Sequence, residues 1–251
     1  MKAAATIAVA KCGDRNVVVN QRCAPPFSVR QCGDQILLAS SAAAPVGGDE
    51  LSLTIDVGPA AHAQVGSVAA SMVWPGTQGQ SSSMSTDCTV ANDAHLDLWL
   101  EPTISIDGSH HSAATVVRLD AGATCRVVEE VQLGRTGEPS GHLDLSLRVE
   151  RGGRPLLHHH ESFGPTVAGA LSSVSVGAAR FAVAAVIVGV DVGLPSVRVE
   201  DHRAAAWLPI APDAATAMAV AADRPAAINL LDELNARCLQ RSEYRSSTSR
   251  G

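Results

Sequence analysis

Strict alternation of polar and apolar residues is the feature that most constrains the fold of this chain. The alternation runs without a fault through Glu50–Val57, His95–Leu100 and His142–Glu150. A period of two residues places every apolar side chain of a segment on one face, as in a strand with one buried side. The apolar stretch Ala3–Ala10 is at the short end of what a signal peptide needs, and we interpret it as an opening strand. The sequence therefore predicts a mainly β protein.

Glycines and repeated turns divide the predicted strands. Gly152-Gly153 stands between two strand patterns and predicts a tight hairpin, because both residues tolerate positive φ. Gly47-Gly48 likewise predicts a turn ahead of the strand that starts at Glu50. The segment Asp56–Ala63 is echoed by Asp120–Cys125, and each copy leaves one strand pattern and enters another. We interpret this echo as a recurring strand–turn–strand unit of the kind that stacks into layered sheets.

Composition excludes several classes of protein. Aromatic residues are only 3%, so Ala, Val and Leu must build the core, and the net charge of −6 argues against a nucleic-acid binder. The longest apolar run, Phe181–Val190, is shorter than the roughly 20 residues of a membrane span. The cysteines lack the C-x-x-C spacing of zinc or redox sites. Reduced cysteines in a cytoplasmic protein are the favoured interpretation.

The C-terminal third carries the helix signals. Apolar residues recur at helical spacing in Pro225–Leu239, with Asp223 as the capping residue. The alanine-rich segment Asp213–Ala222 is a second helix candidate, and Gly76–Ser85 is predicted to be a flexible loop. No linker divides the chain, so we expect one domain over residues 1–240. Residues 241–251 are predicted to form a disordered tail.

Two clusters of titratable residues have the composition of a functional site. His158-His159-His160-Glu161 on a strand would place His158 and His160 on one face and His159 and Glu161 on the other, and these groups suit nickel, zinc or copper. A solvent-exposed strand end is the alternative. Glu129-Glu130 either turns one carboxylate inward or lies on an edge strand with both side chains in water. Phosphate-loop, dinucleotide, zinc-protease and nucleophile-elbow motifs are absent from the sequence.

An ordered set of short motifs resembles the UreD family of urease accessory proteins. The resemblance covers residues 15–165 well and the C-terminal third loosely, and the ordered set rather than any single motif carries it. The matching segments are Val46–Leu51 (V-G-G-D-x-L), Val57–Ala63, Trp99–Ile104 with Asp107-Gly108, Glu129–Arg135 with Gly137-Glu138, and Leu143–Val149 with Gly152-Gly153 and Pro155–Leu157. The sequence departs from the family at Ala42–Pro45, after Trp99-Leu100, at Met72 and at His159, where the family often has an acidic residue.

The resemblance implies a β-helix-like arrangement of layered sheets with a few helices towards the C-terminus. It also implies a non-enzymatic role in urease maturation, with the urease apoprotein, UreF and, through UreF, the GTPase UreG as partners. The family is thought to offer a polar internal passage for nickel, which would bind transiently, and no tightly bound cofactor is expected. Carried over residue by residue, the passage candidates are Asp49, Ser71, Glu129 and His159.

Two other functions remain open from the residues alone. A metal-dependent hydrolase would use His158, His159, His160 and Glu161. A β-rich interaction module without nickel transfer would need none of these groups. The apolar stripe of the predicted C-terminal helix, Leu230, Leu231 and Leu234, is a candidate surface for UreF, although it would equally serve to cover the sheet.

Overall fold

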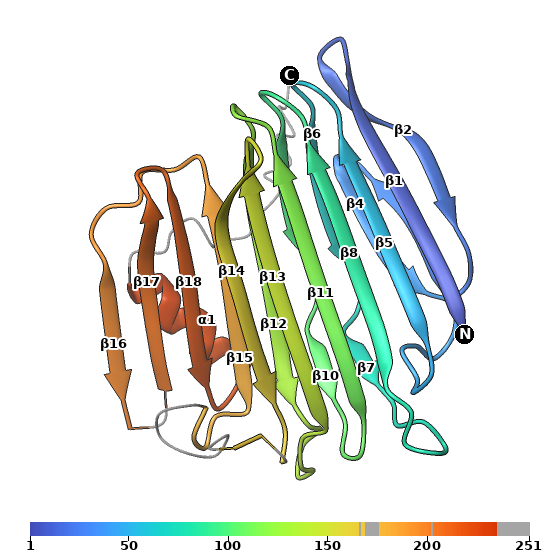
Figure 1. Cartoon of the computed structure of the whole chain (residues 1–251), viewed down its shortest axis with the longest axis vertical. Helices are drawn as coiled ribbons and strands as arrows, with labels where there is room; N and C mark the ends of the chain where they lie inside the picture. Colours follow the sequence, from blue (N-terminus) through green and yellow to red (C-terminus); the bar gives the residue numbers. More distant parts are fainter. Residues whose placement is uncertain (166, 169–175, 202, 235–251) are drawn as a thin grey trace, which may run out of the picture.

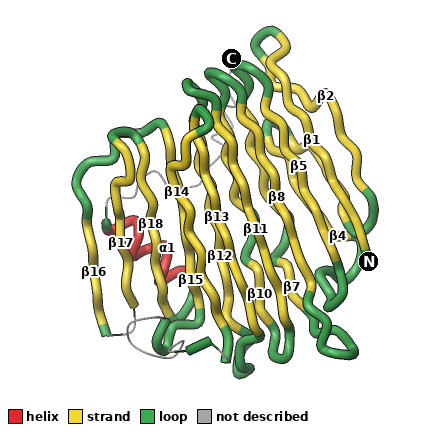
Figure 2. Tube along the Cα trace, viewed as in Figure 1, coloured by secondary structure: helices red, strands yellow, loops and turns green. Residues whose placement is uncertain are grey.

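Two β-sheets packed face to face form the body of the protein (Figures 1 and 2). The computed structural model describes residues 1–165, 167–168, 176–201 and 203–234. Within these residues, sheet A has seven strands in the order β14, β13, β11, β8, β5, β1, β2. The bounds in sheet A are β1 (Lys2–Cys12), β2 (Arg15–Cys23), β5 (Glu50–Val57), β8 (Ser82–Val90), β11 (His110–Leu119), β13 (His142–Arg151) and β14 (Arg154–Phe163).

Sheet B runs in the order β16, β17, β18, β15, β12, β9, β6, β4, β3, with the short β10 beside β12 and β7 beside β10. Its strands are β3 (Phe27–Cys32), β4 (Gln35–Ser40), β6 (His62–Ser67), β7 (Ser71–Val73), β9 (His95–Trp99), β10 (Thr103–Ser105), β12 (Thr124–Leu133), β15 (Phe181–Val188), β16 (Ser196–Glu200), β17 (Arg203–Ala211) and β18 (Ala214–Ala221). The helix is α1 (Arg224–Glu233).

The chain crosses from sheet A to sheet B and back in successive coils. β5, β8, β11 and β13 pair in parallel in sheet A, while β6, β9 and β12 pair in parallel in sheet B. Parallel neighbours that need a long crossover are here joined through the opposite sheet, which is the geometry of a solenoid. The predicted β-helix-like arrangement of layered sheets is therefore confirmed.

The recurring turn also exists, and it has a third copy that the sequence comparison missed. Ala61, Ala94 and Ala123 each donate their backbone N–H to the carbonyl oxygen three residues earlier, at 3.0–3.1 Å. All three alanines are buried. Consecutive copies are hydrogen-bonded to one another, since His95 N–H reaches Ala61 O and Thr124 N–H reaches Ala94 O. The small side chain lets the coils stack closely at this end of the molecule.

Small aliphatic side chains fill the space between the sheets, as the composition predicted. Each inward strand position contributes one layer, and Ile7, Ile55, Leu96 and Leu147 are fully buried there. The three alternating segments coincide with β5, β9 and β13, and the apolar stretch Ala3–Ala10 lies in β1, as predicted. The glycine pair at Gly152-Gly153 joins β13 to β14 with φ of 57° and 74°, as expected for the hairpin.

A second core lies on the outer face of sheet B. There β15, β18, β17 and β16 form an antiparallel extension, and α1 packs across it. Asp223 caps α1 by accepting the N–H of Ala226 at 2.9 Å, as predicted. Leu230, Leu231 and Leu234 are buried against the sheet, so the apolar stripe of the described helix covers β-structure.

Two local predictions were wrong. Residues 214–221 form β18 and not a helix, because pairing with β15 and β17 outweighs the helix propensity of alanine. Ser82–Ser85 belong to β8 and not to a loop, since β8 lies between β5 and β11. Residues 235–239 of the predicted helix, Cys238 and the predicted tail at 241–251 lie outside the described residues.

Five cysteines fall within the described part of the chain, and all five are free: Cys12, Cys23, Cys32, Cys88 and Cys125. The helix that the structure describes is too short to cross a bilayer.

Candidate functional site

A cavity of about 290 Å³ lies between the two sheets. It forms where sheet B is interrupted, because β6 and β7 are separated by Val68–Ala70 and β9 and β10 by Leu100–Pro102. Most of its wall is apolar. The polar residues that line it are Ser40, Ser67, Ser71, Thr86, Glu101, Thr103, His111, Thr115, Glu129 and Glu130.

The acidic pair Glu129-Glu130 lies at this interruption. β12 pairs with β9 up to Val128 and with β10 from Val131. The two glutamates therefore lie in the gap between these two runs of strand pairing. On its other side β12 pairs with β15 throughout. The edge-strand interpretation of the pair is therefore wrong: β12 is an internal strand, and adjacent residues on it point to opposite, enclosed faces of sheet B.

Glu129 faces sheet A. Thr115 Oγ1 on β11 donates to Glu129 Oε1 at 2.7 Å. Burial raises the pKa of Glu129, and this effect is opposed by the Thr115 hydrogen bond and by the charge of His159. A carboxylate in this setting accepts few fixed hydrogen bonds and gains from a nearby cation.

Glu130 faces the second core. Trp99 Nε1 donates to Glu130 Oε1 at 2.9 Å, and Arg224 Nε donates to Oε2 at 2.7 Å. Arg224, the first residue of α1, also approaches Glu101 at 3.7 Å. The side chain of Glu130 is completely buried, so its charge is balanced by Arg224. This group ties α1 to the interruption in sheet B.

His159 lies beside the Glu129 region but is not part of the cavity lining. Register places it in one row across sheet A with Thr115, with Leu147 between them. Its Nε2 is 3.4 Å from Glu161 Oε2. That contact raises the pKa of His159, and the charge of Glu129 adds to the effect.

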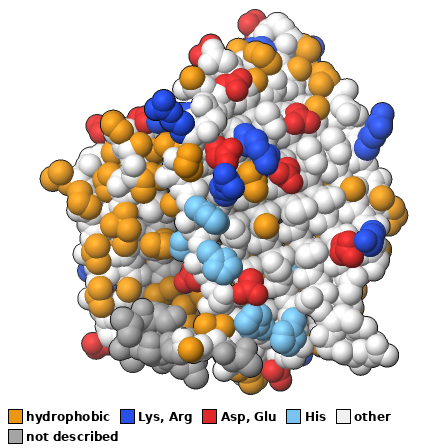
Figure 3. Space-filling model, viewed as in Figure 1, with side chains coloured by type: hydrophobic (Ala, Val, Ile, Leu, Met, Phe, Trp, Pro, Cys, Tyr) orange, Lys and Arg blue, Asp and Glu red, His pale blue; other side chains and the backbone are white. Residues whose placement is uncertain are grey.

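The other residues of this histidine run follow the predicted alternation. His158 and His160 are exposed, whereas His159 and Glu161 are partly buried. Imidazoles gather on the outer surface of sheet A (Figure 3), where His110 and His142 also stack with ring centroids 5.6 Å apart. No three His, Cys, Asp or Glu side chains among the described residues are arranged to hold a metal ion.

Asp49 makes a structural contact directly before the start of β5 in sheet A. Its carboxylate accepts the N–H of Val46 at 2.9 Å and pairs with the N-terminal amino group of Met1 at 2.8 Å. Burial acts to raise the pKa of Asp49, but these two contacts outweigh it and lower the pKa. Gly47 and Gly48 form the predicted turn beside it, and a Cβ on Gly47 would lie 2.3 Å from Gln80 O.

The cavity thus brings together two of the four passage candidates. Ser71 on β7 and Glu129 both line it, whereas Asp49 and His159 do not. Sequence reasoning missed His111, Thr86, Thr115 and Glu101. The segment His111–Leu119 does contain an alternation signal, because His111, Thr115, Val117 and Leu119 are its buried positions.

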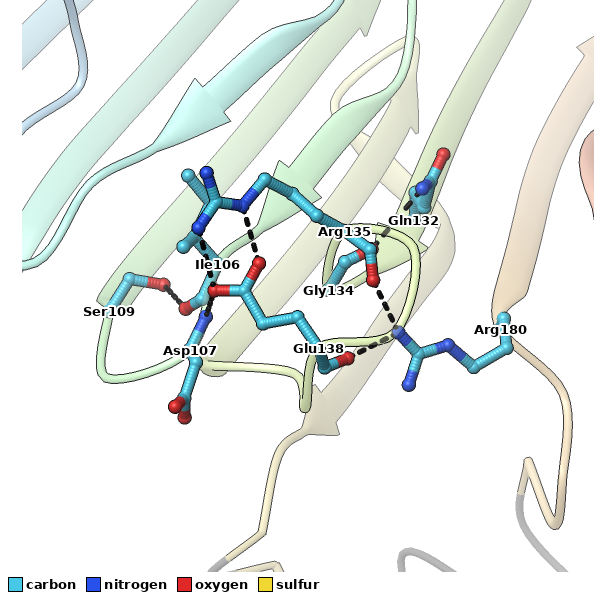
Figure 4. A network of polar contacts seen from close by, with 8 residues as sticks. All are labelled: Ile106, Asp107, Ser109, Gln132, Gly134, Arg135, Glu138 and Arg180. Atoms are coloured by element: carbon cyan, nitrogen blue, oxygen red, sulfur yellow. Dashed lines mark hydrogen bonds and ion pairs between the residues drawn. The ribbon is translucent and has the colours of Figure 1, made fainter.

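The loop after the Leu133-Gly134-Arg135 motif closes one end of the sheets. It crosses from β12 to β13, and Figure 4 shows the Arg135 and Glu138 side chains pointing at each other. Asp107 N–H donates to Glu138 Oε1 at 3.1 Å, and Arg180 donates to the main-chain oxygens of Arg135 and Glu138. The motif therefore serves as an anchor for the crossover.

Comparison with known proteins gives one consistent family. The model of the UreD urease accessory protein family matches residues 1–245. A urease accessory protein UreD of Frankia alni is 35% identical over 200 residues, which is 73% of this chain and 62% of that relative. Similar proteins of the same name from Parafrankia and Streptomyces coelicolor are 32% identical over 242 residues and 34% identical over 202 residues.

These two alignments cover 86% and 79% of this chain, and 82% and 79% of the relatives. The alignment spans a little under two thirds of the Frankia alni protein. The chain belongs to the UreD family of urease accessory proteins.

Proposed function

We propose that this chain is a non-catalytic accessory protein of urease maturation and that the cavity between its sheets is a passage for nickel. The observation that carries the proposal is Glu129: a partly buried carboxylate between the two sheets, hydrogen-bonded to the Thr115 hydroxyl, on the wall of the cavity. Membership of the UreD family supports the role in maturation. The names of the relatives describe them as urease accessory proteins.

The ligand set suits transfer better than storage. A single carboxylate with hydroxyl neighbours offers weak oxygen ligands, and an ion held this way can leave again. Ser71 and Glu129 would contact the ion directly in the cavity. His159 would act through its charge on Glu129, and Asp49 by fixing the Gly47-Gly48 turn.

The partners implied by this role are the urease apoprotein, UreF and, through UreF, UreG, all in the cytoplasm. The hydrolase alternative loses its support, because the three histidines of residues 158–160 alternate between the two faces of β14. A metal-dependent hydrolase would need them to converge on one ion.

The test is urease activation in a host that carries the urease structural genes and every accessory gene except this one. We expect the wild-type chain to restore urease activity and the nickel content of urease. Glu129→Gln should restore much less of both, while the variant still binds UreF. The matched control is Glu50→Gln, which changes an exposed glutamate paired only with Lys2 and should behave as wild type. Full activation by Glu129→Gln would overturn the passage.

A further inference from the structure

The cavity wall contains a nitrogen ligand that no motif indicated. His111 lies on β11 and is only 4% exposed, and its side chain contributes to the lining. The other polar groups of the cavity are hydroxyls and carboxylates, which offer oxygen alone. His111 therefore adds a nitrogen ligand to its end of a cavity whose other polar groups offer oxygen.

Ser82 holds the imidazole in one orientation. It is the register partner of His111 on β8, and its Oγ lies 2.8 Å from His111 Nδ1. The same hydroxyl makes a longer contact of 3.5 Å with the carbonyl oxygen of His110, which accepts its proton. In the tautomer that carries its proton on Nδ1, the Ser82 hydroxyl accepts that proton, and Nε2 keeps its lone pair.

This arrangement is the one that metal-binding histidines use. Their second nitrogen typically donates to an oxygen of the protein, which fixes the tautomer and the ring plane. Burial also lowers the pKa of His111 to about 4, against a smaller opposing effect of a hydrogen bond to the Ser82 main chain. The ring is therefore neutral at physiological pH and keeps its lone pair available.

We infer that the His111–Ser82 pair is a selectivity station of the cavity, at which Nε2 of His111 binds Ni²⁺, Zn²⁺ or Cu²⁺ and disfavours Mg²⁺ and Ca²⁺. Imidazole suits the transition metals, whereas carboxylates and hydroxyls alone also accept the hard cations. The inference rests on the proposed passage and adds discrimination to it. His111 and Thr115 are four residues apart on one strand, about 13 Å, so the station is separate from Glu129.

The test measures metal binding by the purified full-length chain, with Ni²⁺ and Mg²⁺ as separate probes in equilibrium dialysis. His111→Asn keeps a polar group near the Nδ1 position and removes Nε2. We expect it to weaken Ni²⁺ binding and to leave Mg²⁺ binding unchanged. Ser82→Ala keeps the imidazole and removes its orienting partner, and should weaken Ni²⁺ binding by about 10-fold to 100-fold.

His95 supplies a matched control. Its Nδ1 lies 2.7 Å from Thr124 Oγ1, and its pKa is also lowered to about 4 by burial. It stands on the outer face of sheet B, outside the lining of the cavity. His95→Asn should leave Ni²⁺ binding unchanged. With Cu²⁺ as a spectroscopic probe, one nitrogen hyperfine contribution should be lost in His111→Asn and kept in His95→Asn, while the contribution of the exposed imidazoles is common to both.

The outcomes separate this inference from the passage itself. If Glu129→Gln removes Ni²⁺ binding but His111→Asn and Ser82→Ala both retain it, the station is overturned and the passage stands. Equal losses of Ni²⁺ and Mg²⁺ binding in His111→Asn would also overturn the station, because they indicate a general loss of structure. Selective loss of Ni²⁺ in both His111 and Ser82 variants supports it.

Discussion

At the scale of single residues, Glu129 lowers the stability of the fold when it is ionised, although its proposed role needs a carboxylate. Its raised pKa means that the folded state holds a proton more tightly than the unfolded chain. The folded state therefore loses stability as the pH rises from about 4.5 through the pKa of Glu129 in the fold. Ionisation of this carboxyl in the fold therefore comes at the expense of stability, which is a common property of functional sites.

We expect Glu129→Gln to raise the free energy of unfolding at pH 7, because the amide keeps a partner for Thr115 and carries no charge. The gain should shrink as the pH falls towards 4.5, because the wild-type carboxyl then takes up its proton in the fold and the cost of burying the charge is relieved. Urea denaturation at pH 7 and at pH 4.5 measures the difference. A loss of stability at pH 7 would mean that the charge of Glu129 is compensated in the fold.

Gly134 and Gly137 allow a comparison within one loop. Both have positive φ, 78° and 76°, but a Cβ on Gly134 would lie 2.5 Å from two main-chain oxygens, whereas one on Gly137 would meet nothing within 4 Å. Gly137→Ala should cost about 1–2 kcal/mol from backbone strain alone. Gly134→Ala should cost about 1–3 kcal/mol more because of the added clash. Equal losses in thermal denaturation would contradict the anchoring role of the loop.

At the scale of elements, a strand could be predicted from the sequence when its two faces differ in exposure to solvent. β5 and β13 each have one buried and one wetter face, so their alternation identified them. β15 is buried at every position, and β18 at six of eight, so neither shows a regular period along its length. The alanines of β18 have high helix propensity, but they lie under α1, where small side chains allow close packing. Only the tertiary partners reveal this segment as a strand.

The attachment of α1 to sheet B gives a prediction at the same scale. Arg224→Ala would leave the buried carboxylate of Glu130 with Trp99 as a remaining partner. Because Arg224 is 36% exposed, we expect a loss of about 2–3 kcal/mol, below the 3–5 kcal/mol of a fully buried pair. Arg198→Ala on β16 removes exposed ion pairs with Glu200 and with Glu233 of α1 and should cost at most about 1 kcal/mol. Chemical denaturation of both variants decides whether the burial of Glu130 matters.

At the scale of the whole molecule, the site is a product of coil stacking. Ser71, His111 and Glu129 come from three different coils, and no short motif contains two of them. The family resemblance predicted Ser71 and Glu129 because they lie near family motifs. The resemblance could not predict His111 or Thr115 as cavity residues, since their position in the cavity depends on the register between β8, β11 and β13. The resemblance also could not show that Asp49 lies outside the cavity, where it pairs with the N-terminal amino group.

Two histidines with lowered pKa make the stability of the whole fold sensitive to mild acid. His95 and His111 both have a pKa of about 4 in the fold, against 6.5 in the unfolded chain. Between these values only the unfolded chain takes up the protons, so stability must fall as the pH falls. The full effect is on the order of 3 kcal/mol for His111 and less for His95, which is partly exposed. Glu129 opposes this trend near pH 4.5, whereas His159, with its raised pKa, acts above pH 6.5.

We therefore expect the free energy of unfolding to decrease from pH 6.5 to pH 4 and the double variant His95→Asn, His111→Asn to flatten that decrease. Urea titrations across this range measure both curves. Asp49, Asp144 and Asp213, whose pKa values are lowered by their partners, lose their contribution only below pH 3.8 and so do not account for the slope. A wild-type curve that stays flat between pH 6.5 and pH 4 would mean that the two imidazoles reach water. In that case His111 would lose the low pKa that keeps it neutral in the cavity in mild acid.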